Sequence, residues 1–208
     1  AHLFREAFEK AERYEQARLL SPDTTPKDRG LDVLVQALNR EIPLRAHAYR
    51  ADDILTVIRL CKEFGLDLIL EHGYEAVMVL DQVKAAGVGV VYGPAFRTCG
   101  NSEQLNFGFE HVKTLLDAGL KVAVMTDHPI VPIQYLPLQA GLCVRHGVAP
   151  EAALRCITAT AADLLGVADR VGRLKPGLDA DLVRLDGPPL AVESRVTGVW
   201  VDGQPITG

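Results

Sequence analysis

The sequence has few cysteines, no long apolar run and no cluster of basic residues. Its four cysteines lie far apart without a Cys-x-x-Cys pair, which predicts free thiols in a reducing cytoplasm: Cys61, Cys99, Cys143 and Cys156. No apolar stretch approaches the roughly 20 residues of a membrane-spanning helix, and the charged N-terminus does not resemble a signal peptide. With a net charge of −5 and no basic patch, neither nucleic acid nor an anionic membrane is expected as a partner.

Several common catalytic motifs are missing as well. The sequence has no Gly-x-Gly-x-x-Gly after a strand, no P-loop and no Gly-x-Ser-x-Gly elbow. Dinucleotide binding, nucleotide hydrolysis and serine-hydrolase chemistry therefore find no support. Apolar residues make up 48% of the 208 residues, which is enough for one large domain, or for one domain and a piece of another.

A repeating pattern of apolar strands and amphipathic helices fills the middle of the chain. Strands are expected to start near residues 43, 67, 88 and 121, each followed by a helical pattern. This alternation predicts βαβ units with a parallel sheet buried on both faces. Open doubly wound sheets and (β/α)8 barrels share it, and four units would be half of a barrel. Two further helices, joined by a polar loop, are expected before the first strand.

The pattern of residue types changes near Val171, where short segments rich in β-branched residues are interrupted by glycines. The segment "VWVDGQPI" predicts a hairpin that turns at Asp202 and Gly203. We therefore expect a barrel-like unit over residues 1–168. An antiparallel unit, part of a small β-sandwich domain, is expected over residues 169–208.

Three of the expected strands end in side chains that bind metals. His47 ends the first ("LRAHAYR"), His72 the second ("LILEHG") and Asp127 the fourth ("AVMTDHP"). Functional residues gather at the carboxyl ends of parallel strands. Two histidines and a carboxylate suit Zn²⁺ or a similar divalent ion. A lone histidine at a strand end is more often structural, so the prediction depends on the three occurring together.

Asp127 is the most informative of the three. A carboxylate that closes an apolar strand costs free energy unless its charge is compensated. A metal ion would compensate it, but so would a helix N-cap or an ion pair. Pro129 and Pro132 disfavour an immediate helix start, because the residue before a proline avoids the helical region.

Neighbouring side chains receive weaker assignments. His128 points away from Asp127 in an extended strand, so it is expected to line the substrate pocket or to support the metal ligands. Tyr49 shares a strand face with His47 and either lines the pocket or packs at its rim. His111 lies on an expected helix and is expected to face solvent.

With these residues in place, the sequence resembles the amidohydrolase superfamily of metal-dependent hydrolases. His47, His72 and Asp127 match the strand-end ligands of strands five, six and eight. The segment "TATAADLLGVADRVGRLKPGLDADLV" is similar to the closing signature of the superfamily. "HAYRADDI" and "TDHPIVPIQYLPLQAG" are similar to motifs of the imidazolonepropionase-like group. The resemblance implies the C-terminal half of a TIM-like (β/α)8 barrel plus part of a small β-sandwich.

The resemblance also implies a chemistry. His47 and His72 would bind a divalent metal, most suitably Zn²⁺, and Asp127 would bind it and shuttle a proton. A metal-bound water would attack a non-peptide C–N bond of the cyclic amide or imine type in a small molecule. Asp127 would accept the proton of that water and deliver it to the leaving nitrogen.

The sequence departs from the family pattern in several places. The His-x-His pair of strand one and a bridging ligand of strand four have no counterpart. Tyr49 stands where relatives have the second histidine of His-Ala-His, and Thr160, Ala161 and Ala162 stand where relatives often have Asn-Pro-Ala. We therefore expect the C-terminal portion of a longer enzyme.

A half barrel leaves two sheet edges unpaired. We expect either the missing N-terminal half or a second copy of the chain to cover them. Two alternatives stay open. One is a catalytically inactive remnant that serves as a binding or assembly module, and the other is an open α/β binding fold with unrelated chemistry.

Overall fold

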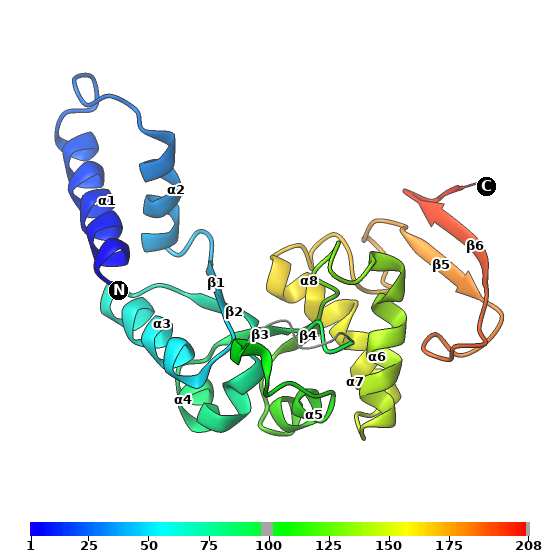
Figure 1. Ribbon diagram of the computed structural model, residues 1–208. Helices are drawn as coiled ribbons and strands as arrows, with labels where there is room; N and C mark the ends of the chain where they lie inside the picture. Colours follow the sequence, from blue (N-terminus) through cyan, green and yellow to red (C-terminus); the bar gives the residue numbers. More distant parts are fainter. Residues whose placement is uncertain (97–101, 207–208) are drawn as a thin grey trace.

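The computed structural model describes residues 1–96 and 102–206, so Cys99 lies outside the described residues. Its centre is a four-stranded parallel sheet in the order β1-β2-β3-β4 (Figure 1). The strands are β1 (Leu44–Ala48), β2 (Leu68–His72), β3 (Gly89–Tyr92) and β4 (Val122–Val124). Each strand begins one residue after its predicted start, which confirms the predicted parallel sheet. The half-barrel interpretation stays a prediction.

Helices connect the strands, and most of them cover one face of the sheet (Figure 1). In chain order they are α3 (Ala51–Phe64), η1 (Tyr74–Val79), α4 (Leu80–Ala85), η2 (Ser102–Gln104), α5 (Glu110–Asp117), η3 (Ile133–Tyr135), α6 (Leu136–Arg145), α7 (Pro150–Cys156) and α8 (Ala159–Leu165). Gly65 ends α3 in a left-handed conformation with φ 68°, which glycine adopts without steric cost.

The two faces of the sheet differ in composition, because successive side chains of a strand point to opposite sides. The helix-covered face holds the main core, where Leu70, Val90 and Val122 have no exposed surface. We call the other side the open face, and its strand residues are Arg45, His47, Ile69, Glu71, Gly89, Val91 and Ala123. Leu164 of α8 packs against the apolar members of the open face.

Two local predictions are wrong. The helical pattern after the second strand predicts one helix ending at Gly87, but the chain forms η1 and then α4. The hydrogen bond from Glu75 N to the Tyr49 carbonyl, 2.9 Å, ties this segment to the end of β1 and tightens its first turns. In addition, β4 ends at Val124, so Asp127 lies beyond the strand. The last backbone hydrogen bond between the β3 and β4 segments is donated by Met125 N to the Tyr92 carbonyl at 3.0 Å.

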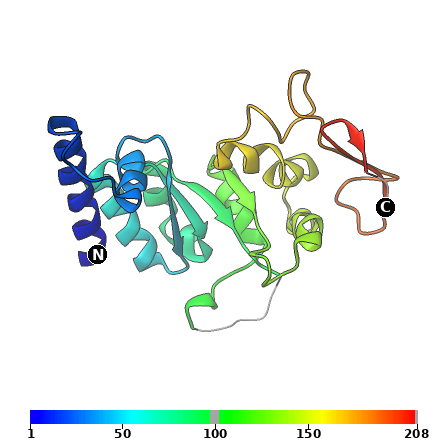
Figure 2. The same ribbon diagram turned by 90° about the horizontal axis from the view of Figure 1, so that it is seen from above.

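A helical hairpin projects from the sheet, as Figures 1 and 2 show. It consists of α1 (His2–Leu20) and α2 (Arg29–Leu38), which confirms the two helices expected before the first strand. Asp28 caps α2 by accepting from the backbone N–H groups of Gly30 and Leu31 at 2.9 and 3.1 Å. Phe8 of α1 is buried and belongs to a second small core beneath the hairpin.

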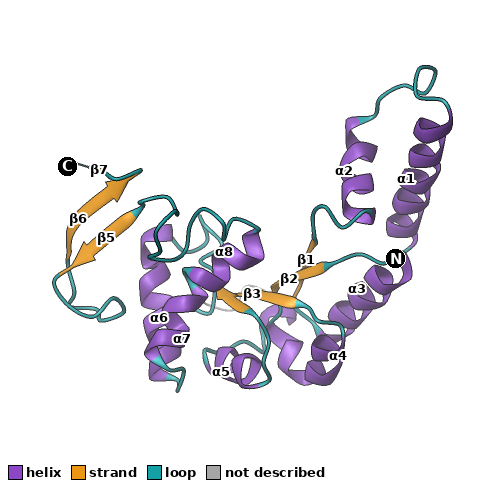
Figure 3. Ribbon diagram, turned by 180° about the vertical axis from the view of Figure 1, so that it is seen from behind, coloured by secondary structure: helices purple, strands orange, loops and turns teal. Residues whose placement is uncertain are grey.

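The C-terminal segment forms a separate three-stranded antiparallel sheet (Figure 3). Its strands are β5 (Leu182–Leu185), β6 (Val196–Val201) and β7 (Gln204–Pro205). Asp202 and Gly203 turn between β6 and β7 with φ of 49° and 75°, which confirms the predicted hairpin. The second layer of a sandwich is not formed within residues 1–96 and 102–206, so the sandwich and the domain boundary stay predictions.

The described helices are too short or too polar to span a membrane.

Candidate metal centre

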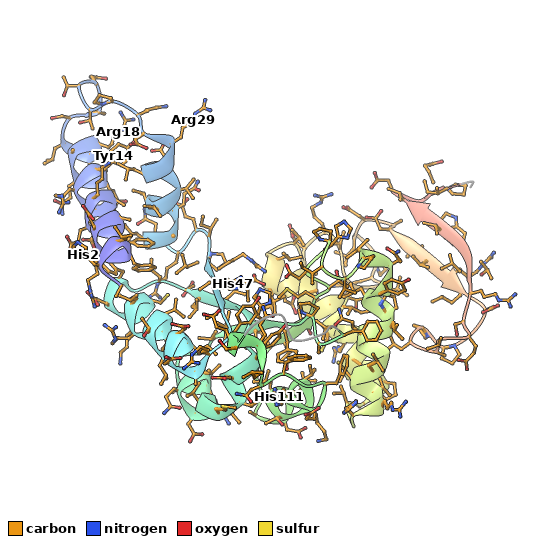
Figure 4. The ribbon with its side chains drawn as sticks, in the orientation of Figure 1. His2, Tyr14, Arg18, Arg29, His47 and His111 are labelled. Carbon is orange, nitrogen blue, oxygen red and sulfur yellow. The ribbon has the colours of Figure 1, made fainter. Side chains whose placement is uncertain are left out.

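His47 and His72 lie side by side at the carboxyl edge of the sheet. His47 is exposed in β1, next to its last residue, and His72 ends β2 with 3% of its surface exposed. Nε2 of His72 lies 3.1 Å from Nδ1 of His47. Figure 4 shows His47 beside the sheet, between the helical hairpin and α8. The structure therefore brings two of the three predicted ligands together.

An unusual backbone conformation at His72 allows this contact. In the strand register His72 pairs with Ala48 and Tyr92, whose side chains belong to the core on the helix-covered face. A regular strand would therefore direct the His72 ring away from His47. Instead His72 is left-handed, with φ 69°, which costs a non-glycine residue roughly 1–2 kcal/mol. Non-glycine residues held in this way are concentrated at functional sites.

A second hydrogen bond fixes the His72 ring. Its Nδ1 lies 2.7 Å from the carbonyl oxygen of Gly93. Because a carbonyl oxygen only accepts, Nδ1 must carry the proton, and a neutral His72 then presents the lone pair of Nε2 towards His47. A backbone carbonyl that holds one ring nitrogen and orients the other is common among metal-binding histidines.

The separation of the two nitrogens suits a shared cation. Two nitrogens about 2.0–2.1 Å from one ion lie roughly 3.3 Å apart in a tetrahedron and roughly 2.9 Å apart at a right angle. The distance of 3.1 Å between His47 and His72 lies between these values. In the absence of an ion, His47 Nδ1 must donate a proton to His72, and a divalent ion would take the place of that proton. The pair therefore fits two ligands of one metal.

Asp127 presents a partly buried carboxylate in the turn after β4. Its backbone φ is 52°, and its carbonyl accepts from Ile130 N at 2.8 Å. Within the described part of the chain the carboxylate makes no ion pair and caps no helix, since the next helical turn starts at Ile133. Both structural alternatives raised by the sequence are therefore absent there, and the charge still needs compensation.

Asp127 is nevertheless separate from the histidine pair. Across residues 1–96 and 102–206, no three His, Cys, Asp or Glu side chains form a group that could hold a metal ion. Because β3 lies between β2 and β4, their backbones are roughly 10 Å apart at the usual strand spacing. The role of Asp127 as ligand and proton shuttle stays a prediction.

Tyr49 packs against both histidines. Its ring centroid lies 4.7 Å from that of His47 and 4.5 Å from that of His72. The Tyr74 ring centroid lies 5.0 Å from that of Tyr49, and Tyr49 is 8% exposed. This contact supports the two rings from one side, while a role of Tyr49 towards substrate stays a prediction. His128 is exposed in the loop after β4, and its role in the pocket is also untested.

The prediction that His111 faces solvent is wrong. Figure 4 labels it on α5, where it is partly buried. Its Nδ1 lies 3.1 Å from the Tyr92 hydroxyl and 3.1 Å from the Tyr74 carbonyl. The Tyr92 hydroxyl also donates to the Gly108 carbonyl at 2.9 Å, and burial raises the pKa of this phenol. Helical periodicity did not reveal that the segment around Gly108 would fold over this side of α5.

Two residues that hold the loops of this edge were missed in the sequence. The Gly93 carbonyl orients His72, and Glu75 joins two loops. Glu75 accepts from Ala51 N at 2.7 Å and from the Asn106 side chain at 2.8 Å. The signal available was position alone, since Gly93 directly follows β3 and Glu75 lies three residues after the end of β2.

The described cysteines are free and buried, which confirms the prediction for them. Burial raises the pKa of the thiols of Cys61 and Cys156 to about 11 and that of Cys143 to about 12. They are therefore protonated at neutral pH and unsuited to act as nucleophiles or metal ligands.

Comparisons with known proteins agree on one family. The profile of the Amidohydrolase family matches residues 23–208. The chain is 29% identical over 184 residues to "Amidohydrolase tasK" of Hapsidospora irregularis, which covers 86% of this chain and 19% of that protein. It is 31% identical over 188 residues to an imidazolonepropionase of Rubrobacter xylanophilus, covering 80% of this chain and 43% of that protein.

A solved structure is similar along nearly the whole chain. The crystal structure of an amidohydrolase from Thermotoga maritima has a TM-score of 0.94 and 35% sequence identity, over 99% of this chain and 55% of that one. This likeness fits a fold of the TIM-barrel type. The chain spans less than half of the two curated relatives and about half of the solved chain.

Proposed function

The chain belongs to the amidohydrolase family, and on that premise we propose that it carries part of the active site of a metal-dependent hydrolase. The enzyme would cleave a non-peptide C–N bond in a small molecule. The observation that carries the proposal is the His47–His72 pair, with its nitrogens 3.1 Å apart and His72 locked by the Gly93 carbonyl.

His47 and His72 would hold a divalent ion, which the amidohydrolase family generally uses. Zn²⁺ is the best match to two imidazoles and a carboxylate. When bound, such an ion supplies an activated water at neutral pH and polarises the carbon of the scissile bond. The hydrogen bond to Gly93 places the proton of a neutral His72 on Nδ1 and aims Nε2 at the ion site, so little reorganisation is needed when the ion binds.

Asp127 would move the proton of the reaction. Its carboxylate would accept a proton from the attacking water as the new C–O bond forms. It would then deliver that proton to the nitrogen as the C–N bond breaks. The lack of an ion pair between Asp127 and the described residues supports this role, because it leaves the carboxylate oxygens accessible to the attacking water.

We propose a cyclic amide or imine as the substrate type, on the resemblance to imidazolonepropionases. Two histidines and one aspartate leave the coordination of an ion to be completed from elsewhere. Since the chain spans about half of its solved relative, we propose that a preceding segment of the same protein supplies the remaining ligands. That segment, or a second copy of the chain, would also cover the sheet edges at β1 and β4.

A catalytically inactive binding module is the alternative. It is favoured by the lack of a three-ligand group among residues 1–96 and 102–206. The hydrolase proposal expects zinc binding that depends on His72, and the binding-module proposal does not. A metal titration therefore separates them.

The experiment is a zinc titration of the whole protein, as its gene encodes it, in competition with a coloured chelator. We expect His72→Ala to weaken zinc affinity by roughly 100-fold or more, beyond the 10–100-fold typical of residues that only support a ligand. The matched control is His146→Ala, a partly exposed histidine after α6, which should leave affinity unchanged. Equal affinities in wild type and His72→Ala, with no effect of chelator on thermal stability, would favour the inactive module.

A further inference from the structure

One fully buried polar side chain lies next to the candidate metal centre without belonging to it. Gln139 is on α6 and has 0% of its surface exposed. A buried amide is costly unless each of its polar atoms is paired, and the neighbouring buried residues of the main core are apolar. The partners of Gln139 therefore indicate what the residue does.

The Gln139 amide bonds to two different loops. Its Oε1 accepts from the backbone N–H groups of Ala95 and Phe96 at 3.0 and 3.3 Å, in the segment after β3. Its Nε2 donates to the Met125 carbonyl at 2.8 Å, in the segment after β4. One side chain thus holds the strand-end segments of two adjacent strands together.

These two segments are also in direct backbone contact. Gly93 has φ 132°, and a Cβ atom placed on it would lie 2.5 Å from the Met125 carbonyl oxygen. A residue with a side chain would therefore force the segments apart. The same Met125 carbonyl receives the hydrogen bond from Gln139. We call the three hydrogen bonds of the Gln139 amide the clamp. The clamp and the contact of Gly93 with Met125 therefore meet at the Met125 carbonyl.

Each of the two segments is connected to a proposed ligand, one by a hydrogen bond and the other along the chain. The Gly93 carbonyl fixes the ring of His72, and Gly93 is close in sequence to Ala95, which Gln139 holds. Met125 is close in sequence to Asp127. The relative position of His72 and Asp127 therefore depends on the backbone groups that Gln139 joins.

We propose that Gln139 is a positioning residue that sets the separation of His72 and Asp127. The proposal rests on the function proposed above, because it assumes that these two residues serve one metal ion. Within the described residues, Gln139 makes no hydrogen bond to either of them. It acts through the backbone at Ala95, Phe96 and Met125, and so fixes the position of the His72 ring relative to the turn that carries Asp127.

The test compares Gln139→Met with Cys143→Ala in the whole protein. Methionine has a similar length but cannot make the three hydrogen bonds. Cys143 lies one turn further along α6 and is 1% exposed in the apolar core, so its variant reports ordinary loss of α6 packing. The readouts are zinc affinity by chelator competition and the visible absorption spectrum after Co²⁺ substitution. The spectrum responds to ligand geometry and is insensitive to a uniform loss of stability.

We expect Gln139→Met to weaken zinc affinity by about 10–100-fold, the range seen when a residue that supports a ligand is removed. We also expect its Co²⁺ spectrum to change, whereas Cys143→Ala should keep both properties of the wild type. Affinity and spectrum unchanged in Gln139→Met, with His72→Ala still losing zinc, would overturn the positioning role. If wild type and His72→Ala bind zinc equally, the proposed function itself fails, so the two failures are distinct.

A measurement on the unaltered protein keeps the proposal testable if Gln139→Met does not fold. Amide hydrogen exchange at Ala95 and Phe96 should be slow, because both N–H groups are held by a buried acceptor. Exchange at the rate of unprotected amides at both positions would show that the clamp is not formed in solution and would overturn the proposal.

Discussion

The helix-covered face and the open face of the parallel sheet use the same four strands for different purposes. On the helix-covered face, Leu70, Val90 and Val122 are fully buried among helices. On the open face, His47 is exposed and Arg45 pairs with Glu71. The comparison shows that the stability of the fold and the candidate chemistry are carried by alternate residues of one strand, often next to one another.

At the carboxyl edge of the sheet, the His72 ring leaves the face to which the strand register assigns it. His72 belongs by register to the helix-covered face, but its left-handed backbone and its bond to Gly93 bring its ring to His47. The candidate metal centre is therefore built where the regular strand pattern is broken. Substitutions on the two faces should accordingly affect different measurements.

The largest effect on stability is expected on the helix-covered face. Leu70→Ala removes a side chain with no exposed surface, and we expect a loss of about 2–5 kcal/mol in the free energy of unfolding. Chemical denaturation measures this loss. Zinc affinity, measured on the protein that stays folded, should be close to that of the wild type. A strong loss of affinity would contradict the separation of the two faces.

The next largest effect is expected on the open face. At a zinc concentration 100 times the dissociation constant, a bound ion should stabilise the wild type by about 2.7 kcal/mol. His47→Ala should lose most of this increment, because it removes one of the paired nitrogens. In the presence of a chelator its stability should fall by only about 1 kcal/mol, because His47 is exposed and loses one hydrogen bond to His72. Thermal unfolding with and without zinc tests both statements.

At alkaline pH the buried thiols of the helix-covered face should lower the free energy of unfolding. Burial raises the pKa of Cys143 to about 12, so the folded protein keeps this proton while the unfolded chain loses it. Stability from this group is complete below the pKa of the unfolded thiol, about 8.5, and falls as pH rises from there towards 12. The slope approaches about 1.4 kcal/mol per pH unit.

Denaturation midpoints measured from pH 7 to 10.5 should therefore decline for the wild type. Cys143→Ala should show a shallower decline, since it lacks this one group. An equal slope in both proteins would mean that the Cys143 thiol ionises as readily in the folded state as in the unfolded chain.

The smallest effect is expected at the ion pair of the open face. Arg45 Nη2 lies 2.5 Å from Glu71 Oε1, with side-chain exposures of 37% and 19%. Arg45 also donates to the Leu164 carbonyl at the end of α8, 3.2 Å away. Glu71→Gln should cost about 0.2–1 kcal/mol, and less at high salt because the charges are partly screened. Denaturation at two salt concentrations measures it, and a cost that does not fall with salt would contradict the ion-pair explanation.

Much of the fold could be predicted because its signals are local. The four strands start one residue from their expected positions, since each is a short apolar run bounded by turn residues. The hairpin at Asp202 and Gly203 forms as expected, because this dipeptide favours the left-handed turn that joins twisted strands. The proximity of His47 and His72 could be expected as well, because neighbouring parallel strands end at one edge.

Other features could not be read from local patterns. His111 was expected in solvent, but Tyr92 and the Tyr74 carbonyl surround it. The strand before Asp127 was expected to run on, but β4 loses its partner after Tyr92. Gln139 carried no local signal, because its partners lie in two segments distant along the chain. Each of these depends on contacts between residues far apart in sequence.

The sequence by itself determined the order of strands and helices, the parallel sheet and the identity of the two paired histidines. Side-chain periodicity and glycine positions act within a few residues, so they can be recognised without a fold. The tertiary structure alone decided that His72 would adopt a left-handed backbone and turn to His47, and that Gln139 would join the loops beside it. Such conformations persist because the surrounding hydrogen bonds and packing compensate their cost, and those neighbours assemble only when the chain folds.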